Sequence, residues 1–397
     1  MIGSGPAGLM AAHVLATRGF AVTLFEKKQT LGAKLLIAGS SGLNVTHKVT
    51  EDASLEEFVA FYRGPRGHFQ KILKDFSPQD WLKFIKSLGI ETFLGTSRRY
   101  FVDGMKAAPL LRSWLNHLKE LGVEILTRHE CVDFEALQEN PSRVRLSFQN
   151  GISQEFSAAL FALGGGSYEN HEIPLRWPGL FTRKGVAFIP FEASNVGFEV
   201  EWTQAFKTEA EGKPLKNVTL TSSKGKVTGD LMVTQYGLEG TPIYQVGEVG
   251  EVFLDLKPDL TFTSALARLV KSRENLSPMR RIKKFMKLSP AAYALLFHHA
   301  PKEIQTDLEA LVKCVKKFPL HLEAKRPLAE AISSAGGVSF DELDETLMLR
   351  KYPGIYAAGE MLNWDAPTGG FLIQACVSQG HLVGAAMSER ATLASGR

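Results

Sequence analysis

A run of closely spaced glycines opens this chain, in the sequence MIGSGPAGLMAAHVLATRG, and leaves few folds open to it. The spacing G-x-G-x-x-G gives dinucleotide-binding units a tight turn, a close approach of backbone to pyrophosphate, and close packing of helix on sheet. Pro6 suits the first helical turn, where its missing N–H costs nothing, and Gly19 suits the helix end. We therefore expect a dinucleotide pyrophosphate to bind at six residues: Gly3, Ser4, Gly5, Pro6, Ala7 and Gly8.

An acidic residue follows at the position where such units bind the adenosine ribose. Residues 20–25, FAVTLF, read as a buried parallel strand that ends at Glu26, 18 residues after Gly8. A carboxylate there accepts hydrogen bonds from a ribose and would repel a 2′-phosphate, so FAD or NAD fits and NADP fits poorly. We include Lys27 in the cofactor-binding set. A glycine turn of purely structural use is the alternative.

The strand that should carry these glycines is too short in the sequence. A central parallel strand needs about 5 to 6 residues, whereas only Met1 and Ile2 precede Gly3. We therefore expect the natural chain to carry a few more, mostly apolar, residues ahead of Met1.

The segment after Glu26 favours FAD over NAD. Residues 30–47, TLGAKLLIAGSSGLNVTH, are rich in glycine where a simple NAD dehydrogenase would return through a helix to a third strand. We expect Lys34 to pair with the pyrophosphate, Gly42 to lie on the cofactor and Asn44 to hydrogen-bond near the flavin ring. A surface lysine and a turn asparagine are the alternatives.

Two later segments also fit a flavin site. Residues 158–168 form a strand that runs into Gly164 and Gly165, and residues 354–380 form a strand, an acidic turn, a glycine pair and a helix. An acid at such a strand end bonds a ribityl hydroxyl, and the helix N-terminus carries a partial positive charge that stabilises a reduced, anionic flavin. An ordinary loop and helix cap is the alternative. We assign these two roles to six residues: Gly359, Glu360, Thr368, Gly369, Gly370 and Phe371.

Together these motifs resemble a known bacterial family. The segments GSGPAGLMAA, GAKLLIAGSSGLNVTH, MKAAPLLRSWL, GDLMVTQYGLEGTPIYQ, RPLAEAISSAGGV and YAAGEMLNWDAPTGGFLIQAC look like the YhiN/BaiN-type FAD-dependent oxidoreductases, nearest to their uncharacterised flavoprotein branch. The resemblance implies an α/β fold: a Rossmann-like FAD-binding domain, split in sequence, with an inserted β-rich domain and a helical sub-insertion. It also implies bound FAD and a nicotinamide donor; one relative reduces carbon–carbon double bonds of oxo-bile acids. Ala33 and the GSSGLN loop depart from the family, which often has arginine and GGG-x-C-N there.

The domain limits follow from changes of pattern along the chain. We expect the FAD-binding domain at 1–175 and 333–397, the β-rich substrate-side domain at 176–260 and 318–332, and the helical insertion at 261–317. Within the first domain, Val132 is expected to touch the adenine, as the corresponding strand does in such folds. Three serines, Ser77, Ser277 and Ser289, each precede a proline and predict helix starts.

Catalytic residues are harder to assign. Tyr236, in the loop MVTQYGLEG of the β-rich insert, could donate a proton to the substrate, although a packed tyrosine at a strand end is the alternative. His47, Arg99 and Lys106 are further candidates, each with a surface or structural alternative. The chain has no second G-x-G-x-x-G, so NAD(P)H is expected to visit the flavin as a transient donor.

Composition bears on partners and compartment. The net charge of +4 is mild, and the three cysteines form no C-x-x-C pair, so neither a redox dithiol nor a zinc knuckle is readable. Sparse cysteines fit a reducing cytoplasm, and no apolar run reaches the ~18 residues of a membrane span. The basic cluster at 280–287 is expected to be a solvated helix face, since it lacks aromatic interleaving of the kind that stacks bases. Steering of an anionic substrate and contact with RNA are the alternatives.

We therefore expect an FAD-dependent oxidoreductase that reduces a small or medium apolar substrate such as an enone. A flavin-dependent RNA-modifying enzyme, a non-catalytic FAD-binding redox sensor and a plain NAD dehydrogenase are the alternatives. The substrate and the oligomeric state are not readable from the sequence.

Overall fold

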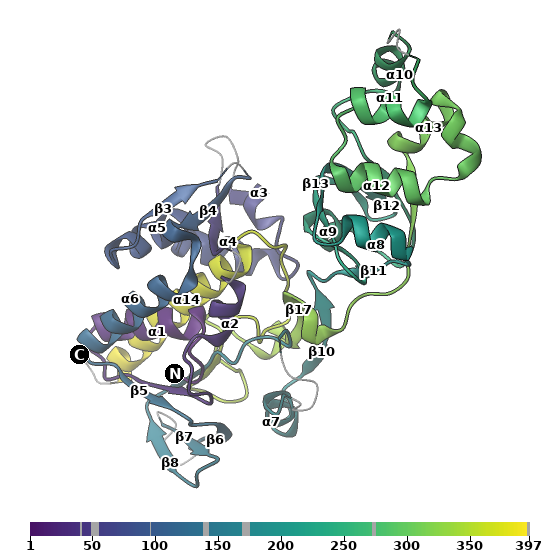
Figure 1. The fold of residues 1–397 in the computed structure, drawn as a ribbon. Helices are drawn as coiled ribbons and strands as arrows, with labels where there is room; N and C mark the ends of the chain where they lie inside the picture. Colours follow the sequence, from purple (N-terminus) through teal and green to yellow (C-terminus); the bar gives the residue numbers. More distant parts are fainter. Residues whose placement is uncertain are drawn as a thin grey trace. The chain divides into compact units, whose positions relative to one another are not determined.

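The chain folds into two compact units, each with its own hydrophobic core. Unit 1 comprises residues 1–192 and 332–397, and unit 2 comprises residues 193–331 (Figure 1). The computed structural model describes the following residues: 1–39, 42–48, 55–95, 97–137, 143–168, 175–271 and 275–394.

A short parallel sheet lies at the centre of unit 1. Strands β1 and β5 pair in parallel, as do β9 and β18, and Ile2 bridges the two pairs through Phe25 and Phe161. The strand order is thus β5–β1–Ile2–β9–β18, with Ile2 in the central position that the glycine motif requires. The sequence prediction of a Rossmann-like sheet is confirmed. The strands are β1 (Thr23–Glu26), β5 (Glu124–Thr127), β9 (Ala159–Phe161) and β18 (Ile355–Ala357).

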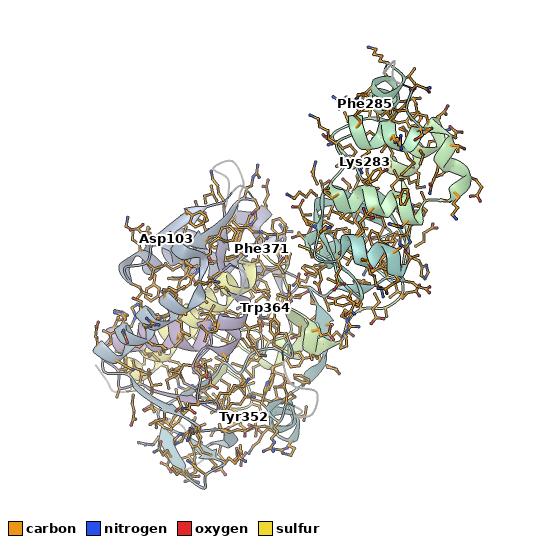
Figure 2. The ribbon with its side chains drawn as sticks, viewed as in Figure 1. Asp103, Lys283, Phe285, Tyr352, Trp364 and Phe371 are labelled. Carbon is orange, nitrogen blue, oxygen red and sulfur yellow. The ribbon has the colours of Figure 1, made fainter. Side chains whose placement is uncertain are left out.

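Two helices from opposite ends of the chain pack together in unit 1: α1 (Pro6–Thr17) and α14 (Phe371–Ala394) (Figure 1). Their backbones approach closely, because a Cβ on Gly380 would lie only 2.3 Å from the Ala7 carbonyl oxygen. The helix α1 is apolar nearly all round, as expected of a helix in a core, whereas α14 also buries the polar side chains of Gln374, Ser378 and Gln379. Figure 2 marks Phe371, where α14 begins.

The remaining elements of unit 1 surround this centre. A small antiparallel sheet of β2, β4 and β3 packs near the start of α14, and β6, β7 and β8 form a second antiparallel sheet. The helices are α2 (Ala33–Ala38), α3 (Leu55–Val59), α4 (Arg66–Asp75), α5 (Pro78–Ser87) and α6 (Ala107–Glu120). The strands are β2 (Asn44–His47), β3 (Thr92–Leu94), β4 (Arg99–Val102), β6 (Cys131–Ala136), β7 (Val144–Phe148) and β8 (Ser153–Phe156).

The helix α7 (Trp177–Arg183) belongs to unit 1, although the sequence analysis places it in the substrate-side domain. The Phe181 ring lies 5.2 Å from that of Phe134 and 5.3 Å from that of Phe161, so the helix packs on the central sheet. This packing moves the limit of the unit to the paired strands β10 (Phe188–Ser194) and β17 (Ser333–Val338), where the chain leaves and re-enters.

Unit 2 is built on a six-stranded antiparallel sheet in the order β11–β14–β13–β12–β15–β16. The strands are β11 (Phe198–Glu199), β12 (Pro214–Ser222), β13 (Gly225–Val233), β14 (Gly237–Glu239), β15 (Gly250–Asp255) and β16 (Phe318–Leu322). The helices are α8 (Gln204–Ala210), α9 (Thr241–Val246), α10 (Phe262–Val270), α11 (Pro278–Phe285), α12 (Pro290–His299) and α13 (Leu308–Lys316).

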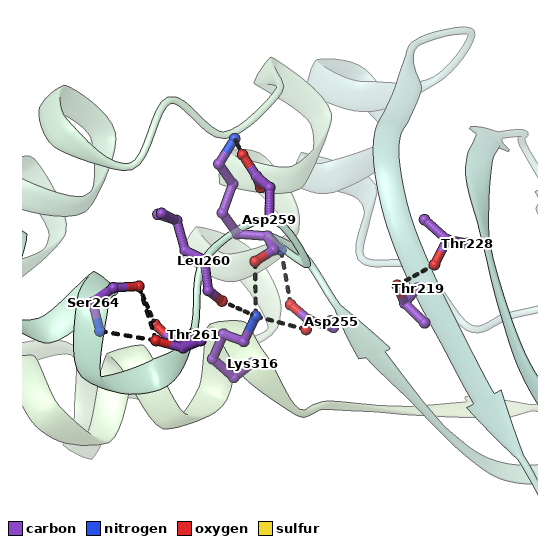
Figure 3. Close-up of polar contacts among 9 residues, drawn as sticks. Thr219, Thr228, Asp255, Asp259, Leu260, Thr261, Ser264 and Lys316 are labelled. Atoms are coloured by element: carbon purple, nitrogen blue, oxygen red, sulfur yellow. Dashed lines mark hydrogen bonds and ion pairs between the residues drawn. The ribbon is translucent and has the colours of Figure 1, made fainter.

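The helical segment of unit 2 shares one core with this sheet. The Lys316 ammonium on α13 makes a 2.7 Å ion pair with Asp255 on β15 and donates to the carbonyl oxygens of Lys257 and Leu260 (Figure 3). This half-buried cation thereby joins the helices to the sheet. No helix in the described part of the chain has both the length and the apolarity to span a bilayer.

Candidate active site

The three motif glycines have different surroundings at the start of α1. A Cβ on Gly3 would lie 2.3 Å from the Ala162 carbonyl oxygen, and one on Gly8 would lie 2.1 Å from the Gly3 carbonyl oxygen. These two glycines therefore permit backbone packing. Nothing lies within 4 Å of a Cβ on Gly5, which is the N-cap. Its carbonyl oxygen accepts from the Leu9 N–H at 3.0 Å, but it has no side chain to bond the first-turn N–H groups. The open space before the first-turn N–H groups fits a pyrophosphate.

Glu26 is held at the end of β1 by the backbone of the glycine turn. Its Oε2 accepts from the Ser4 N–H at 3.1 Å and from the Ser4 hydroxyl at 2.6 Å, and its Oε1 accepts from the Lys28 N–H at 3.0 Å. A carboxylate has about four lone-pair sites, so acceptor capacity remains for ribose hydroxyls. Lys27 points to solvent-exposed surface beside it.

Segments far apart in the sequence meet at Lys34. Its ammonium donates to the Gly165 carbonyl oxygen at 2.6 Å and lies near Gly164. Burial raises the pKa of the Glu360 carboxyl, while the Lys34 charge opposes that shift. Lys34, Gly164, Gly165 and Glu360 therefore form one polar group, as a flavin pyrophosphate and ribityl site requires.

Ser334 is a member of this group that the sequence analysis missed. Its hydroxyl accepts from the Gly166 N–H at 2.8 Å, and a Cβ on Gly165 would lie 2.4 Å from the same oxygen. The Ser334 side chain thus requires a glycine at position 165, although the two residues are 169 positions apart in the sequence. No local sequence signal could reveal this contact.

The start of α14 meets the β2–β4 sheet at two glycines in left-handed conformation. Gly369 has φ +116°, with a Cβ position 3.0 Å from Arg99 Nε, and Gly370 has φ +95°, with a Cβ position 2.5 Å from the Thr46 nitrogen. The Phe371 side chain packs against Phe58 and Phe61, with ring centroids 5.0 and 4.7 Å apart. Only the backbone of Phe371 is therefore left for the cofactor role assigned to it.

Three buried polar atoms of β2 have no hydrogen-bond partner within the described residues: Asn44 Oδ1, Thr46 Oγ1 and His47 Nδ1. Thr46 is fully buried, and an unpaired buried polar atom costs on the order of 1–3 kcal/mol. Such atoms persist where a ligand completes their hydrogen bonds. Asn44 is one of the predicted flavin contacts; Thr46 is not.

His47 and Arg99 face each other across the β2–β4 pair. The His47 ring stacks on Phe371, with centroids 5.0 Å apart and planes at 20°. Burial lowers the pKa of His47, and the Arg99 charge lowers it further. His47 is therefore a neutral imidazole at pH 7, beside a cation that could hold a carbonyl oxygen.

The other residues predicted to bind the cofactor lie outside the polar groups described above. Gly42 has φ +135°, and its Cβ position is 2.7 Å from Met105 Cε. Gly359 donates its N–H to Gln379 Oε1 at 2.7 Å, Thr368 is half-buried, and Val132 is exposed on β6. The roles of these residues remain predictions.

Tyr236 lies in unit 2, in a polar cluster of its own. Its hydroxyl and that of Tyr244 each donate to one oxygen of Glu239, and the Arg326 guanidinium lies 4.5 Å from the Tyr236 ring centroid. Burial and the Glu239 carboxylate raise the pKa of Tyr236, so the phenol stays protonated at neutral pH. Its catalytic role also remains a prediction.

Residues 1–386 match the family model described as HI0933-like protein Rossmann domain. The chain belongs to this family. It is 26% identical to a ribosomal RNA dihydrouridine synthase of Haemophilus influenzae over 395 residues, which cover 94% of each chain. It is also 26% identical to the 3-dehydro-bile acid delta(4,6)-reductase of Clostridium scindens over 424 residues, 98% of each chain.

The fold is shared with solved flavoenzymes. The 3-ketosteroid-delta4-(5alpha)-dehydrogenase of Rhodococcus jostii superposes with a TM-score of 0.54 at 13% identity, over 98% of this chain and 95% of that one. The predicted family and enzyme class are confirmed: the protein is an FAD-dependent oxidoreductase. The open space at Gly5, the Lys34–Glu360 group and the unpaired atoms of β2 all fit FAD in unit 1.

Proposed function

We propose that the protein uses NAD(P)H to reduce a carbon–carbon double bond conjugated with a carbonyl group. The named reactions of two relatives support this proposal, because both a uracil ring and a 3-oxo-Δ4,6 bile acid contain such a bond. The balance is NAD(P)H, a proton and the unsaturated substrate giving NAD(P)⁺ and the saturated carbonyl compound. FAD, when bound, supplies the hydride relay.

Different residues of unit 1 bind different parts of FAD in this proposal. The first-turn amides behind Gly5 bind the pyrophosphate, Glu26 binds the adenosine ribose, and Lys34 neutralises phosphate charge. The start of α14 would face the flavin pyrimidine, and its partial positive charge would favour the reduced state.

The observation that carries the proposal is the unpaired polar pair on β2, Asn44 and Thr46, beside the turn at Gly370. A buried hydroxyl and amide oxygen without partners indicate a site shaped for a polar ligand. Arg99, close to Gly369 in the same place, would hold the substrate carbonyl and polarise its double bond.

Tyr236 is the proposed proton donor. A neutral phenol held by Glu239 can give a proton to the carbon that does not receive hydride. Tyr236→Phe should slow substrate reduction by about 10²- to 10⁴-fold while leaving flavin reduction by NAD(P)H unchanged. Tyr244→Phe, which removes the other phenol on Glu239, is the matched control.

The test is an anaerobic two-step assay. The flavin is first reduced with NADH or NADPH, and the reduced enzyme is then mixed with cyclohex-2-enone, a 3-oxo-Δ4 steroid or cyclohexanone. Reoxidation by either enone, with a product two mass units heavier, is the expected result; the saturated ketone should do nothing. Prompt reduction by nicotinamide with no reoxidation by any conjugated acceptor would contradict the proposal.

Uracil in RNA is the second candidate acceptor. The dihydrouridine synthase named above supports it, since dihydrouridine is uridine with two hydrogens added to its ring double bond. Unit 2 offers a second, independent observation in favour of RNA, in the side chains of α11 and α12.

A further inference from the structure

We infer that unit 2 binds a single-stranded segment of RNA on a face formed by α11 and α12. This inference deepens the second candidate function and rests on it. We call the surface the basic–aromatic face and define it by six residues: Arg280, Lys283, Lys284, Lys287, Tyr293 and Phe297.

The cations of this face come from the exposed side of α11 and from Lys287, the second residue after its end. The helix buries Met279 and Ile282 against the core and leaves Arg280 and Lys283 in solvent. Within the described residues, neither Arg280 nor Lys283 forms an ion pair, so both charges are available to phosphates. Figure 2 marks Lys283 on this helix.

Arg281, which is part of the same sequence cluster, has a different role. Its guanidinium donates to the carbonyl oxygens of Leu269 and Leu276 at 3.2 and 3.1 Å. It thereby ties α11 to the end of α10 and does not belong to the face.

Aromatic rings lie beside these cations, supplied by the next helix. Tyr293 and Phe297 are one turn apart on α12, with ring centroids 6.4 Å apart and planes at 24°. Phe297 is 49% exposed, and the Lys283 ammonium lies 5.0 Å from the Tyr293 ring centroid. The sequence of the basic cluster does not show these rings, because the pairing of α11 with α12 brings them beside the cations.

Cations beside exposed rings match the chemistry of an unpaired nucleic-acid strand. Lysine and arginine track the phosphates, and each exposed ring offers a surface on which a base can stack. An acid also borders the face, but Glu209 is engaged by His298 at 2.9 Å. An acidic peptide offers no flat base to stack on the ring pair, whereas every base of an unpaired strand does.

The test measures binding of a fluorescently labelled twelve-nucleotide oligouridylate to the FAD-loaded enzyme by anisotropy, between 50 and 200 mM salt. Three variants are compared. The first combines Arg280→Gln, Lys283→Gln and Lys287→Gln; the second is Phe297→Ala. The third is the control: it removes one arginine and two lysine charges, as the first does, but from exposed positions of unit 1, by Arg66→Gln, Lys74→Gln and Lys119→Gln.

We expect the face triple variant to weaken binding at least tenfold and to lower the slope of log affinity against log salt by about 2, at about 0.7 per phosphate contact. Phe297→Ala should weaken binding about tenfold with an unchanged slope, since stacking releases no counterions. The unit 1 triple should change affinity by less than threefold.

Equal losses in the two triple variants, or wild-type affinity in Phe297→Ala, would overturn the inference. So would equal displacement of the RNA by a polyglutamate of matched charge. All three variants should reduce enones at the wild-type rate, because none changes a residue of the flavin site. Loss of RNA binding with intact enone turnover thus tests the face alone, whereas failure of enone turnover in the wild type bears on the proposed function.

Discussion

At the scale of single residues, the glycines of the opening motif do separate jobs that the structure distinguishes. Gly3 and Gly8 are needed because other backbone atoms lie where a side chain would start, whereas Gly5 borders open space. The sequence order of turn, helix, strand and acid predicts this motif correctly, because all its parts are local.

Gly5→Ala therefore separates cofactor binding from folding. The φ of Gly5 is −75°, which alanine adopts without strain, so the apoprotein should unfold within about 2 °C of wild type. The added methyl group occupies the space assigned to the pyrophosphate and should weaken FAD binding at least tenfold, about 1.4 kcal/mol. Fluorescence titration with FAD measures this; wild-type affinity would contradict the assignment. Gly8→Ala, the control, should not yield folded protein.

Thr46 gives a second prediction at this scale. Thr46→Val keeps the side-chain shape and removes a buried hydroxyl that has no partner within the described residues. The apoprotein should become more stable, by about 1 kcal/mol in urea unfolding, while affinity for FAD or for the acceptor falls about tenfold. Thr46→Ser, which keeps the hydroxyl, should retain that affinity. A valine variant that binds and reacts like wild type would show that this hydroxyl serves no ligand.

Long-range members of the site could not have been predicted. Thr46 and Ser334 sit in ordinary strand sequence, and their importance arises from glycines far along the chain, Gly370 and Gly165. Only folding brings these pairs together. The predicted flavin contacts Asn44, Lys34 and Glu360 lie in unit 1 with them, and their roles stay predictions.

At the scale of elements, local sequence signals predict where helices begin but do not predict to which unit α7 belongs. Ser77, Ser277 and Ser289 directly precede α5, α11 and α12, as predicted. The sequence pattern predicts α7 in the substrate-side domain, whereas α7 belongs to unit 1. The contacts of Phe181 with Phe134 and Phe161 that hold it there are tertiary and have no local signal. The same limit hid the rings of α12 beside the cations of α11.

A chain of hydrogen bonds joins His68 on α4 and Gln379 on α14 to the backbone of Gly359. This chain should make the stability of the protein depend on pH. Gln379 Oε1 accepts from the Gly359 N–H, so its amide nitrogen must donate to His68 Nε2, 3.3 Å away. Burial, with a smaller contribution from Lys71, lowers the pKa of His68 from 6.5 to about 4. If His68 were protonated, its Nε2–H would point at the N–H of the Gln379 amide, and the hydrogen bond between them would be lost.

Because the folded pKa lies below the unfolded one, the stabilisation is present above pH 6.5 and is lost as the pH falls toward 4. His68→Gln keeps an acceptor that does not titrate. Between pH 7 and 4.5, wild type should lose on the order of 2 kcal/mol more unfolding free energy than the variant. Urea unfolding at both pH values measures the difference, and parallel losses in the two proteins would exclude His68 as the titrating group.

At the scale of the whole molecule, two separate cores predict two unfolding steps. Unit 1 carries all the residues assigned to FAD, and unit 2 has a separate core made of its own sheet and helices. Calorimetry should show two unfolding transitions. FAD at 100 times its Kd should raise the unfolding free energy of unit 1 alone, by about 2.7 kcal/mol. A single transition that moves as a whole with FAD would show that the two units unfold together.

The most direct measurement is the anaerobic absorption spectrum of the purified protein before and after addition of NADH or NADPH. We predict one FAD per chain, with a flavin band near ~450 nm that bleaches with a nicotinamide and returns when a conjugated enone is added. A flavin band that no nicotinamide bleaches would contradict the proposed donor, and a protein that binds no flavin would contradict the site itself.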